Sequence, residues 1–457
     1  MIAHIRDNDI NVHNVTVLRG GDAVLDVDFY PYLGDVPHDV ASVTKSITST
    51  LVGIAVDEGL IESVDVPVLS FFPDVDLDSP SERLDRLTLR HLLTMTSGFC
   101  SDFAGGEAQL DAMRQSDDAV RFMLNQPLLH EPGEHFAYCS GASQLLSAVV
   151  TEATGVNAEA YAESRLFGPL GIEEVIWPTD PQGNNTGWGD LFIRPTDLAK
   201  IGQLFLQRGE WEGERLVSEA WVDEATMQQV ADGEEGYGFR WWVPNSLPGL
   251  YEGRGRGGQR LVVWPQQELV VVMIGSGFDP GELGGFIVEA LTSEGPLPAD
   301  PEADARLREQ IALAASPPPP GPTAPLPAAA RSVSGHRYTF SPNEVGLAAF
   351  RFDFDGGDEA TFTLTLDSPR SQEFGDRVTT VGLDGRYRIT PSSRFDLPVA
   401  ARGYWEDEQT FRFDYDEFAN NHLYDIAIRF NGDEAVLTLS EGTGLFDVTV
   451  EATRDEP

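Results

Sequence analysis

The stretch Ser42-Val-Thr-Lys-Ser-Ile-Thr-Ser-Thr-Leu-Val-Gly-Ile-Ala-Val-Asp-Glu-Gly59 predicts the helix around which the fold is built. Apolar residues recur in it at helical spacing, and Gly59 supplies a C-terminal stop. Ser42 and Lys45 stand three positions apart, so a helix places their side chains on one face. There the amine can hold the serine hydroxyl and, once neutral, take its proton. A helix-capping serine followed by a solvated lysine would give the same pattern.

The scarcity of lysine adds weight to Lys45. The chain contains 31 lysine and arginine residues, and Lys45 and Lys200 are its only lysines. Arginine keeps its charge and cannot act as a base, so a site that needs a titratable amine must keep lysine. We therefore interpret Lys45 as functional, with chance survival as the alternative that Lys200 illustrates.

Length, hydrophobicity and charge narrow the class of protein. A chain of 457 residues is long enough for two or three domains with buried cores. Its hydrophobic content of 41% and its lack of long apolar runs predict a soluble globular protein without a transmembrane helix. The formal net charge of −43 repels nucleic acids and anionic membranes, so we expect neither as a partner. Such acidity is typical of proteins from salt-loving organisms, although a compositional bias of the source genome would also produce it.

The N-terminal segment and the number of cysteines indicate the cellular compartment of the protein. The opening segment, Met-Ile-Ala-His-Ile-Arg-Asp-Asn-Asp, has neither a basic nor an apolar region. The chain as given is therefore predicted to carry no signal peptide, which leaves a cytoplasmic location or export with the signal removed. Cys100 and Cys139 are the only cysteines, too few for a disulfide scaffold. They could pair with each other, but two buried free thiols are the favoured state.

Periodicity and turn signals predict the elements of the first 300 residues. Residues 14–30 are typical of a hairpin whose turn is Arg19-Gly-Gly-Asp22. Helices are predicted at 87–99, 118–125, 141–154 and 195–208, and two strands at 260–275. The second of these strands is nearly all apolar, so we expect it to be central in a sheet and covered on both faces.

The composition changes after residue 300. Residues 303–315 predict a helix, and 316–327 contain seven prolines in twelve positions, which is typical of a stiff extended linker. From Gly335 onward, apolar and polar residues alternate and turn signals separate the runs. This pattern predicts about eight antiparallel strands in a small barrel or sandwich. Its interior should be filled by Phe350, Phe352, Phe411 and Phe413.

Tyr138 and Ser140 open the helix predicted at 141–154, where their side chains can point into a cleft. A phenol beside an ammonium group has a lowered pKa and can act as a base that relays the serine proton. Packing is the alternative role for a tyrosine at a helix start. We expect Asp197, in the first turn of the helix at 195–208, to stabilise that helix rather than to act in catalysis.

The segment Arg254-Gly-Arg-Gly-Gly-Gln259 precedes the strand that starts at 261, and its glycines allow the backbone to approach a substrate. An N–H group there could form an oxyanion hole with the N–H of Ser42. An ordinary hairpin loop is the alternative. The histidines show no ligand spacing, so we expect neither a metal nor a cofactor.

Five motifs in this order resemble those of the serine β-lactamase-related superfamily, across roughly residues 10–295. They are Ser42-Val-Thr-Lys45, His91-Leu-Leu-Thr-Met-Thr-Ser-Gly98, Tyr138-Cys-Ser140, Arg194-Pro-Thr-Asp-Leu-Ala-Lys200 and Arg254-Gly-Arg-Gly-Gly-Gln259. The chain looks most similar to the class C-like carboxylesterases, D-amino-acid peptidases and 6-aminohexanoate-oligomer hydrolases. By this resemblance Ser42 is the acylated nucleophile, Lys45 is its base partner, and Tyr138 is the second base, which also protonates the leaving group.

Two motifs depart from the family pattern. Ser140 stands where the family has an asparagine whose amide would contact a substrate carbonyl, which puts true β-lactamase activity in doubt. Gly253-Arg254-Gly255 stands in place of a Lys/His-Thr/Ser-Gly triad, so the usual cation is missing and Arg254 or Arg256 could bind a substrate carboxylate. The preferred alignment gives the oxyanion N–H to Arg256, and Gly255 and Gly257 flank it in the substrate-binding segment.

The residues and the resemblance together predict an α/β (α+β) sandwich, with an antiparallel sheet flanked by helices and Ser42 between the sheet and a helical lobe. The C-terminal barrel resembles lipocalin-like domains appended to some of these hydrolases. Predicted domains are the hydrolase at 1–300, a helix and linker at 301–334, and the barrel at 335–457. The expected function is a serine hydrolase that cleaves a small ester, amide or short peptide through an acyl-enzyme. The alternatives are a non-catalytic penicillin-binding-like receptor and a true β-lactamase.

Overall fold

The structure, a computed structural model, describes residues 1–32, 34–233, 235–293, 295–368, 373–391, 393–445 and 447–456. The chain divides into two compact units. One consists of Val15–Asp26 and Asp39–Met273, and the other of Met1–Asn14, Val27–His38 and Ile274–Pro457. Within the described residues, no helix is both long and apolar enough to cross a membrane.

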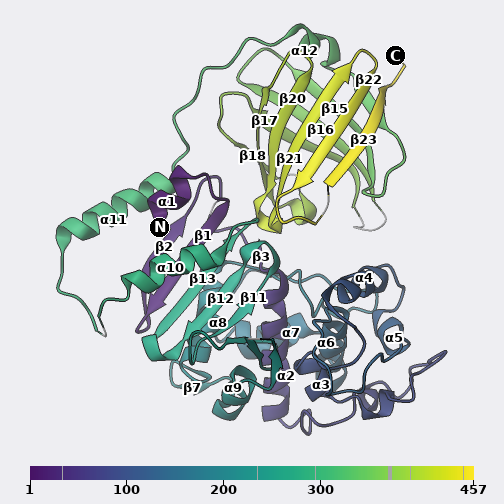
Figure 1. Ribbon diagram of the computed structural model, residues 1–457, viewed down its shortest axis with the longest axis vertical. Coiled ribbons are helices and arrows are strands. Elements are labelled where there is room, and N and C mark those ends of the chain that lie inside the picture. The colour runs from purple at the N-terminus through teal and green to yellow at the C-terminus, as the bar shows by residue number, and fades with distance from the viewer. Residues whose placement is uncertain are drawn as a thin grey trace. The chain divides into compact units, whose positions relative to one another are not determined.

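The predicted central helix is confirmed. A 3-10 turn over Ala41–Val43 leads into α2 (Thr44–Asp57), and Gly59 follows with a φ of 71°. Every residue from Thr44 to Ala55 is buried, including the polar ones. Figure 1 shows why: α2 runs between the strands β11–β13 and the helices α3–α6. A helix in that position must bury its polar side chains as well as its apolar ones, so each needs a partner inside the protein.

An eight-stranded sheet has the order β2-β1-β13-β12-β11-β10-β9-β8. The pairings from β8 through to β13 are antiparallel. The strands are β1 (Val12–Arg19), β2 (Asp22–Asp28), β8 (Val230–Asp232), β9 (Glu235–Tyr237), β10 (Trp242–Pro244), β11 (Tyr251–Arg254), β12 (Arg260–Trp264) and β13 (Leu269–Gly275). The predicted N-terminal hairpin is present, and β13 is buried along its whole length, as its apolar sequence predicted.

Helices pack beside α2 and on the sheet. They are α3 (Leu89–Leu93), α4 (Phe103–Arg114), α5 (Ala119–Leu124), α6 (Gly141–Thr154), α7 (Ala158–Ala162), α8 (Pro195–Leu206) and α9 (Glu219–Thr226), whereas α10 (Pro280–Ala290) belongs to the other compact unit. The helix predicted at 87–99 is too long. Met95 has a φ of 59°, a left-handed conformation that an α-helix cannot contain, so α3 ends before it. Asp197 lies in the first turn of α8 and pairs with Lys200 at 2.7 Å, in line with its predicted role.

The C-terminal strands form a closed barrel. The order β17-β16-β15-β14-β23-β22-β21-β20-β19 closes through a parallel bridge between Gly382 of β17 and Arg402 of β19. The barrel therefore has nine strands, one more than the predicted eight or so, and β18 (Arg388–Pro391) pairs outside the ring with β19. The nine are β14 (Arg337–Phe340), β15 (Leu347–Phe354), β16 (Glu359–Ser368), β17 (Glu373–Gly382), β19 (Pro398–Trp405), β20 (Thr410–Glu417), β21 (His422–Asn431), β22 (Glu434–Glu441) and β23 (Asp447–Arg454).

Aromatic side chains fill the barrel. Phe352 is buried, with ring centroids of Phe362 at 4.7 Å, Phe411 at 5.1 Å and Phe413 at 5.6 Å. The alternating sequence produces this packing because successive strand side chains point to opposite faces. Barrels of about this strand number have an interior just wide enough for side chains to fill, and here phenylalanines fill it.

The barrel has contacts with N-terminal segments of its own compact unit. The ring of Phe418 packs 5.8 Å from Tyr32 and 6.2 Å from His13. Ser276 donates a 2.9 Å hydrogen bond to the carbonyl of Asn421. The helix α11 (Pro301–Ala314), the proline segment 317–327 without helix or strand, and α12 (Ala328–Val333) precede the first barrel strand within the same compact unit.

Candidate active site

Ser42 lies on a backbone bend that precedes α2. Ala41 has a φ of 48°, which is unfavourable for a residue with a Cβ, and such strain is found mainly where surrounding contacts hold it. Two contacts do so here. The carboxylate of Asp39 accepts a 2.8 Å hydrogen bond from the Ala41 N–H, and the Thr44 hydroxyl donates a 2.7 Å bond to the Ala41 carbonyl. Ser42 is partly exposed between buried neighbours, so a substrate can reach its hydroxyl.

Lys45 reaches Ser42 as the three-residue spacing predicted. Its Nζ donates hydrogen bonds of 2.7 Å to Ser42 Oγ and 2.7 Å to the carbonyl of Trp188. The side chain is only 1% exposed. Burial, and then the nearby charge of Arg240, lower the pKa of Lys45 to about 7. A neutral amine is therefore accessible near neutral pH, and a neutral amine can accept the serine proton.

Tyr138 completes the group. Its ring centroid lies 5.0 Å from Lys45 Nζ, and its hydroxyl faces Ser42 in hydrogen-bonding contact. The sequence predicted a lowered pKa for this phenol, and that prediction is wrong. Burial raises the Tyr138 pKa well above 10, and the Tyr237 hydroxyl adds to the rise. Tyr138 thus stays a neutral phenol at ordinary pH, so it carries a proton that it can donate.

Aromatic rings surround Tyr138. Trp242 stacks on it at 6.1 Å with an interplanar angle of 15°, and Phe103 lies 5.9 Å away. Phe103, the first residue of α4, is 60% exposed although it is large and apolar. These rings give the surroundings of Ser42 an apolar wall.

Ser140 precedes α6 and is buried, and its hydroxyl is engaged by a carboxylate. Its buried hydroxyl donates a 3.0 Å hydrogen bond to Glu107 of α4. Glu107 also acts on Lys45, since its negative charge raises the lysine pKa. Ser140 therefore orients a carboxylate whose charge acts on Lys45.

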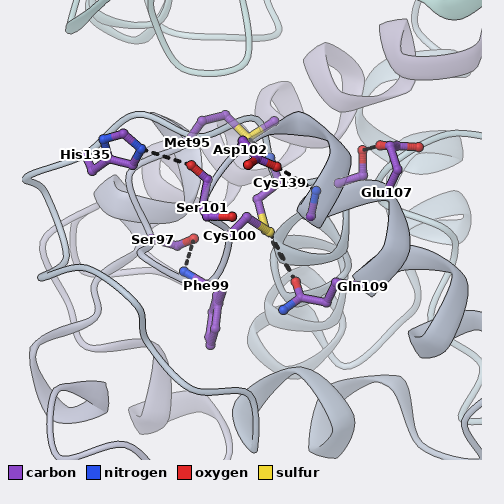
Figure 2. Close-up of a disulfide and its surroundings, with 12 residues drawn as sticks. Met95, Ser97, Phe99, Cys100, Ser101, Asp102, Glu107, Gln109, His135 and Cys139 are labelled. Atoms are coloured by element: carbon purple, nitrogen blue, oxygen red, sulfur yellow. Dashed lines mark hydrogen bonds between the residues drawn. A yellow bond between two sulfur atoms is a disulfide. The ribbon is translucent and has the colours of Figure 1, made fainter.

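The two cysteines form a disulfide, so the prediction of two free thiols is wrong. The Cys100 and Cys139 sulfurs are bonded at 2.06 Å, and Gln109 Oε1 packs 3.3 Å from the first of them (Figure 2). Gly106 explains the close approach that makes the bond possible. A Cβ on Gly106 would lie 2.6 Å from the Tyr138 carbonyl, so only glycine lets α4 pack on this loop. The disulfide fastens the residue between Tyr138 and Ser140.

The glycine-rich segment lies against the loop that carries Ser42. A Cβ on Gly255 would meet the Val40 carbonyl at 2.6 Å, which explains the glycine at the end of β11. The Gly255 N–H bonds to the Gln259 carbonyl at 2.9 Å. Arg256 and Gly257 form a short 3-10 turn, with Gly257 at a φ of 79°. The assignment of the oxyanion N–H to Arg256 stays a prediction.

Arg254 is engaged within the protein. Its guanidinium makes two 2.7 Å bonds to Glu235 and one of 2.8 Å to Glu252, and it stacks 4.8 Å from the Trp242 ring. Binding a substrate carboxylate would require Arg254 to exchange these partners.

Sequence reasoning missed several residues around Lys45: Glu107, Trp188, Asp190, Tyr237 and Arg240. Arg240 had a visible signal, because it is a single charge in the aromatic run Tyr237-Gly-Phe-Arg-Trp-Trp242. Trp188 contributes a backbone carbonyl, which any residue type could supply. Over the described ranges, no group of three or more His, Cys, Asp or Glu side chains is arranged to hold a metal ion.

Comparison with known proteins gives this geometry a family. The profile of the beta-lactamase family matches residues 3–290, more than half of the chain. The chain belongs to the beta-lactamase family. This family member is 26% identical over 291 residues to the 6-aminohexanoate-dimer hydrolase of Paenarthrobacter ureafaciens, an alignment that covers 58% of this chain and 72% of the hydrolase. It is 32% identical over 164 residues to the monacolin J acid methylbutanoyltransferase of Aspergillus terreus, covering 32% of this chain and 39% of the transferase.

A solved structure extends the likeness over the whole chain. The octameric penicillin-binding protein homologue from Pyrococcus abyssi aligns with 99% of this chain and 98% of its own, at a TM-score of 0.54 and 18% identity. At that identity the likeness concerns the fold alone. The predicted family and fold class are confirmed, and the beta-lactamase family member has a hydrolase and an acyltransferase among its relatives.

Proposed function

We propose that this protein is a serine hydrolase that cleaves esters or amides through an acyl-enzyme on Ser42. The observation that carries the proposal is the 2.7 Å hydrogen bond between Lys45 Nζ and Ser42 Oγ, made by a buried lysine whose pKa is about 7. A nucleophilic serine needs a base within hydrogen-bond reach that is partly deprotonated at working pH. Lys45 meets both conditions.

The reaction begins when Lys45 takes the proton of Ser42 as Oγ attacks the substrate carbonyl carbon. The new C–O bond moves the carbonyl electron pair onto oxygen, and backbone N–H groups at Ser42 and at the end of β11 stabilise that oxyanion. Tyr138 then gives its proton to the leaving group as the C–O or C–N bond breaks, and regains one from the Lys45 ammonium. In the second half of the reaction, Lys45 takes a proton from a water molecule as the water oxygen attacks the acyl carbon. The bond between the acyl carbon and Ser42 Oγ then breaks, Oγ takes the proton back, and the acid is released.

The surroundings of Ser42 favour uncharged, apolar substrates. Phe103 and Trp242 offer aromatic surface beside Tyr138, and Glu107 adds negative charge near the base. Like charges repel, so an anionic substrate such as a penicillin carboxylate is disfavoured unless Arg254 leaves its glutamates. The names of the two relatives, a 6-aminohexanoate-dimer hydrolase and a methylbutanoyltransferase, agree with acyl chemistry.

The test is to label the purified protein with a fluorophosphonate and to locate the adduct by mass spectrometry. We expect one adduct, on Ser42, and turnover of p-nitrophenyl esters faster than of nitrocefin. Ser42→Ala should give neither adduct nor turnover. Labelling of Ser42 without turnover of any ester, amide or β-lactam would identify a receptor in place of a hydrolase. An adduct elsewhere would overturn the assignment of the nucleophile.

A further inference from the structure

Arg240 lies in the interior beside the candidate site and has an unusual backbone. It is 2% exposed and has a φ of 69°. Its N–H bonds to the Leu93 carbonyl at 3.1 Å, and its carbonyl accepts a 2.8 Å hydrogen bond from Ser46 Oγ. These bonds hold the Arg240 backbone between α2 and the end of α3, and from there its charge acts on Lys45.

The guanidinium of Arg240 lacks the partners that a buried charge normally has. Its Nη1 lies 2.6 Å from the Met95 sulfur, and its hydrogen-bonding neighbour is the neutral hydroxyl of Tyr237. The buried Nε and Nη2 donate no hydrogen bond, and no carboxylate pairs with Arg240 among the residues that the structure describes. Arg254, by contrast, is neutralised by two glutamates. A buried charge without a counter-ion is costly, so its retention calls for a function.

That function follows from its effect on Lys45. Arginine stays protonated at any ordinary pH, and a fixed like charge disfavours the ammonium form of a neighbouring lysine. The other groups that face Lys45 are Glu107 of α4, Asp190 of the loop before β5 (Phe192–Ile193), the Tyr138 ring and the Trp188 carbonyl. Both carboxylates favour the ammonium, so Arg240 is the charge that opposes them.

We propose that Arg240 is a positioning residue that keeps the Lys45 amine neutral and thereby sets the pH at which Ser42 becomes reactive. This inference rests on the proposed function of Lys45 as the base. Arg240 acts through Lys45 and not on substrate, because its guanidinium nitrogens are shielded from solvent. Met95 links it to the rest of the site, since the same sulfur accepts a 3.4 Å bond from the Cys139 N–H.

The first test measures Lys45 itself and needs no substrate. The chain has two lysines, so protein labelled with ¹³C-lysine gives two Cε signals, and Lys45→Arg assigns them. We expect the Lys45 signal to titrate near pH 7 and Arg240→Gln, which removes the charge, to raise that midpoint by at least about one pH unit. Arg240→Lys keeps a cation and should change the Lys45 midpoint less. The titration midpoint of Lys200 should be the same in all variants. An unchanged Lys45 midpoint in Arg240→Gln would overturn the proposal.

The second test is the pH profile of kcat/KM for a p-nitrophenyl ester. Activity needs neutral Lys45, so it should rise with pH to a plateau above about pH 7. Arg240→Gln should move this acid limb upward by the same amount as the NMR midpoint; for a shift of about one pH unit the loss is about fivefold at pH 7 and recovers near pH 9. Arg208→Gln removes a surface cation and should leave the profile unchanged. A loss in Arg240→Gln that is equal at every pH would mean a merely structural role.

Two controls separate the possible failures. If Arg240→Gln does not fold, Arg240→Met replaces it; removing an unpaired buried charge should not lower the unfolding midpoint. If Ser42 of the wild-type protein is never labelled by fluorophosphonate, the proposed function fails, whereas the lysine titration still tests Arg240. If Ser42 is labelled, and both the Lys45 titration midpoint and the acid limb of kcat/KM stay unchanged in Arg240→Gln and in Arg240→Met, only the inference on Arg240 is wrong.

Discussion

The barrel and the candidate site bury opposite kinds of side chain. In the barrel, Phe352 is surrounded by other phenylalanines, and each added ring removes more apolar surface from water. Around Ser42, the chain buries the ionisable groups Lys45 and Arg240, whose charged forms cost free energy to transfer from water. The difference teaches that the barrel interior favours stability, whereas the site holds a strained, charged arrangement that contacts elsewhere must maintain. Substitutions in the two regions should therefore affect different measurements.

The largest effect is expected for chemistry at the base. Lys45→Arg keeps the positive charge but cannot accept a proton, so kcat should fall by about three orders of magnitude, as should that of Ser42→Ala. Lys200→Arg is the matched control, because it changes the only other lysine, which pairs with Asp197 outside the site. Steady-state kinetics with an ester and thermal unfolding of each variant provide the measurement. More than a tenth of wild-type activity in Lys45→Arg would refute its role as the base.

The barrel should show the reverse behaviour. Phe352→Ala leaves a cavity in the packed interior, and the free energy of unfolding should fall by about 3–5 kcal/mol. Denaturant unfolding followed by aromatic fluorescence measures this loss. Tyr404→Ala, on an exposed ring of β19, should cost far less. The comparison breaks down if Phe352→Ala lowers kcat of the folded protein as strongly as Lys45→Arg does.

The disulfide should affect both measurements, since it lies in the wall of the site. The double variant Cys100→Ser/Cys139→Ser should lose about 2–4 kcal/mol of unfolding free energy. Its kcat/KM should fall by roughly tenfold, because Tyr138 is no longer held by its neighbour and small displacements of catalytic groups slow reactions. Dithiothreitol should reproduce the loss in the wild type and leave the double variant unchanged. A double variant with wild-type kcat/KM would show that the loop holds Tyr138 unaided.

The smallest effect concerns the surface. With a formal net charge of −43, self-repulsion should lower the unfolding midpoint in dilute buffer, and KCl at molar concentration should raise it by a few degrees. Thermal unfolding from low to multimolar KCl measures this. A midpoint that does not change with salt would mean that the acidity has no role in stability and reflects a bias of the source genome.

Local patterns sufficed where neighbours in sequence decide the structure. The spacing of Ser42 and Lys45 predicted their contact, and alternation predicted the buried face that carries Phe352. Local sequence patterns did not predict features that depend on contacts between segments distant in the sequence. The raised pKa of Tyr138 comes from its burial and then from Tyr237, and no local pattern brings Tyr237 or the stacked Trp242 to it. The length of α3 depended on the left-handed conformation of Met95, which an apolar periodicity does not reveal.

The disulfide was disfavoured and Arg240 was missed for the same reason. Cys100 and Cys139 are 39 positions apart, and their approach depends on Gly106 letting α4 touch the opposite loop. Arg240 reaches Lys45 because its backbone bonds to Ser46 and Leu93 from two different helical segments. The lone arginine in an aromatic run was a signal for a special role, but its neighbour could be identified only in three dimensions.

The near absence of lysine makes the protein unusually selective toward amine-directed chemistry. Lys45 is enclosed, and Lys200 is partly exposed and held by Asp197 and the Gly171 carbonyl. Dyes and cross-linkers that modify lysine side chains will therefore find Lys200 as the accessible target, so a tag attached through it leaves the nucleophile untouched. Trypsin will cut this chain almost entirely after arginine. Slow modification of Lys45 by a small amine-reactive compound would then report how often local opening of the protein exposes the Lys45 side chain.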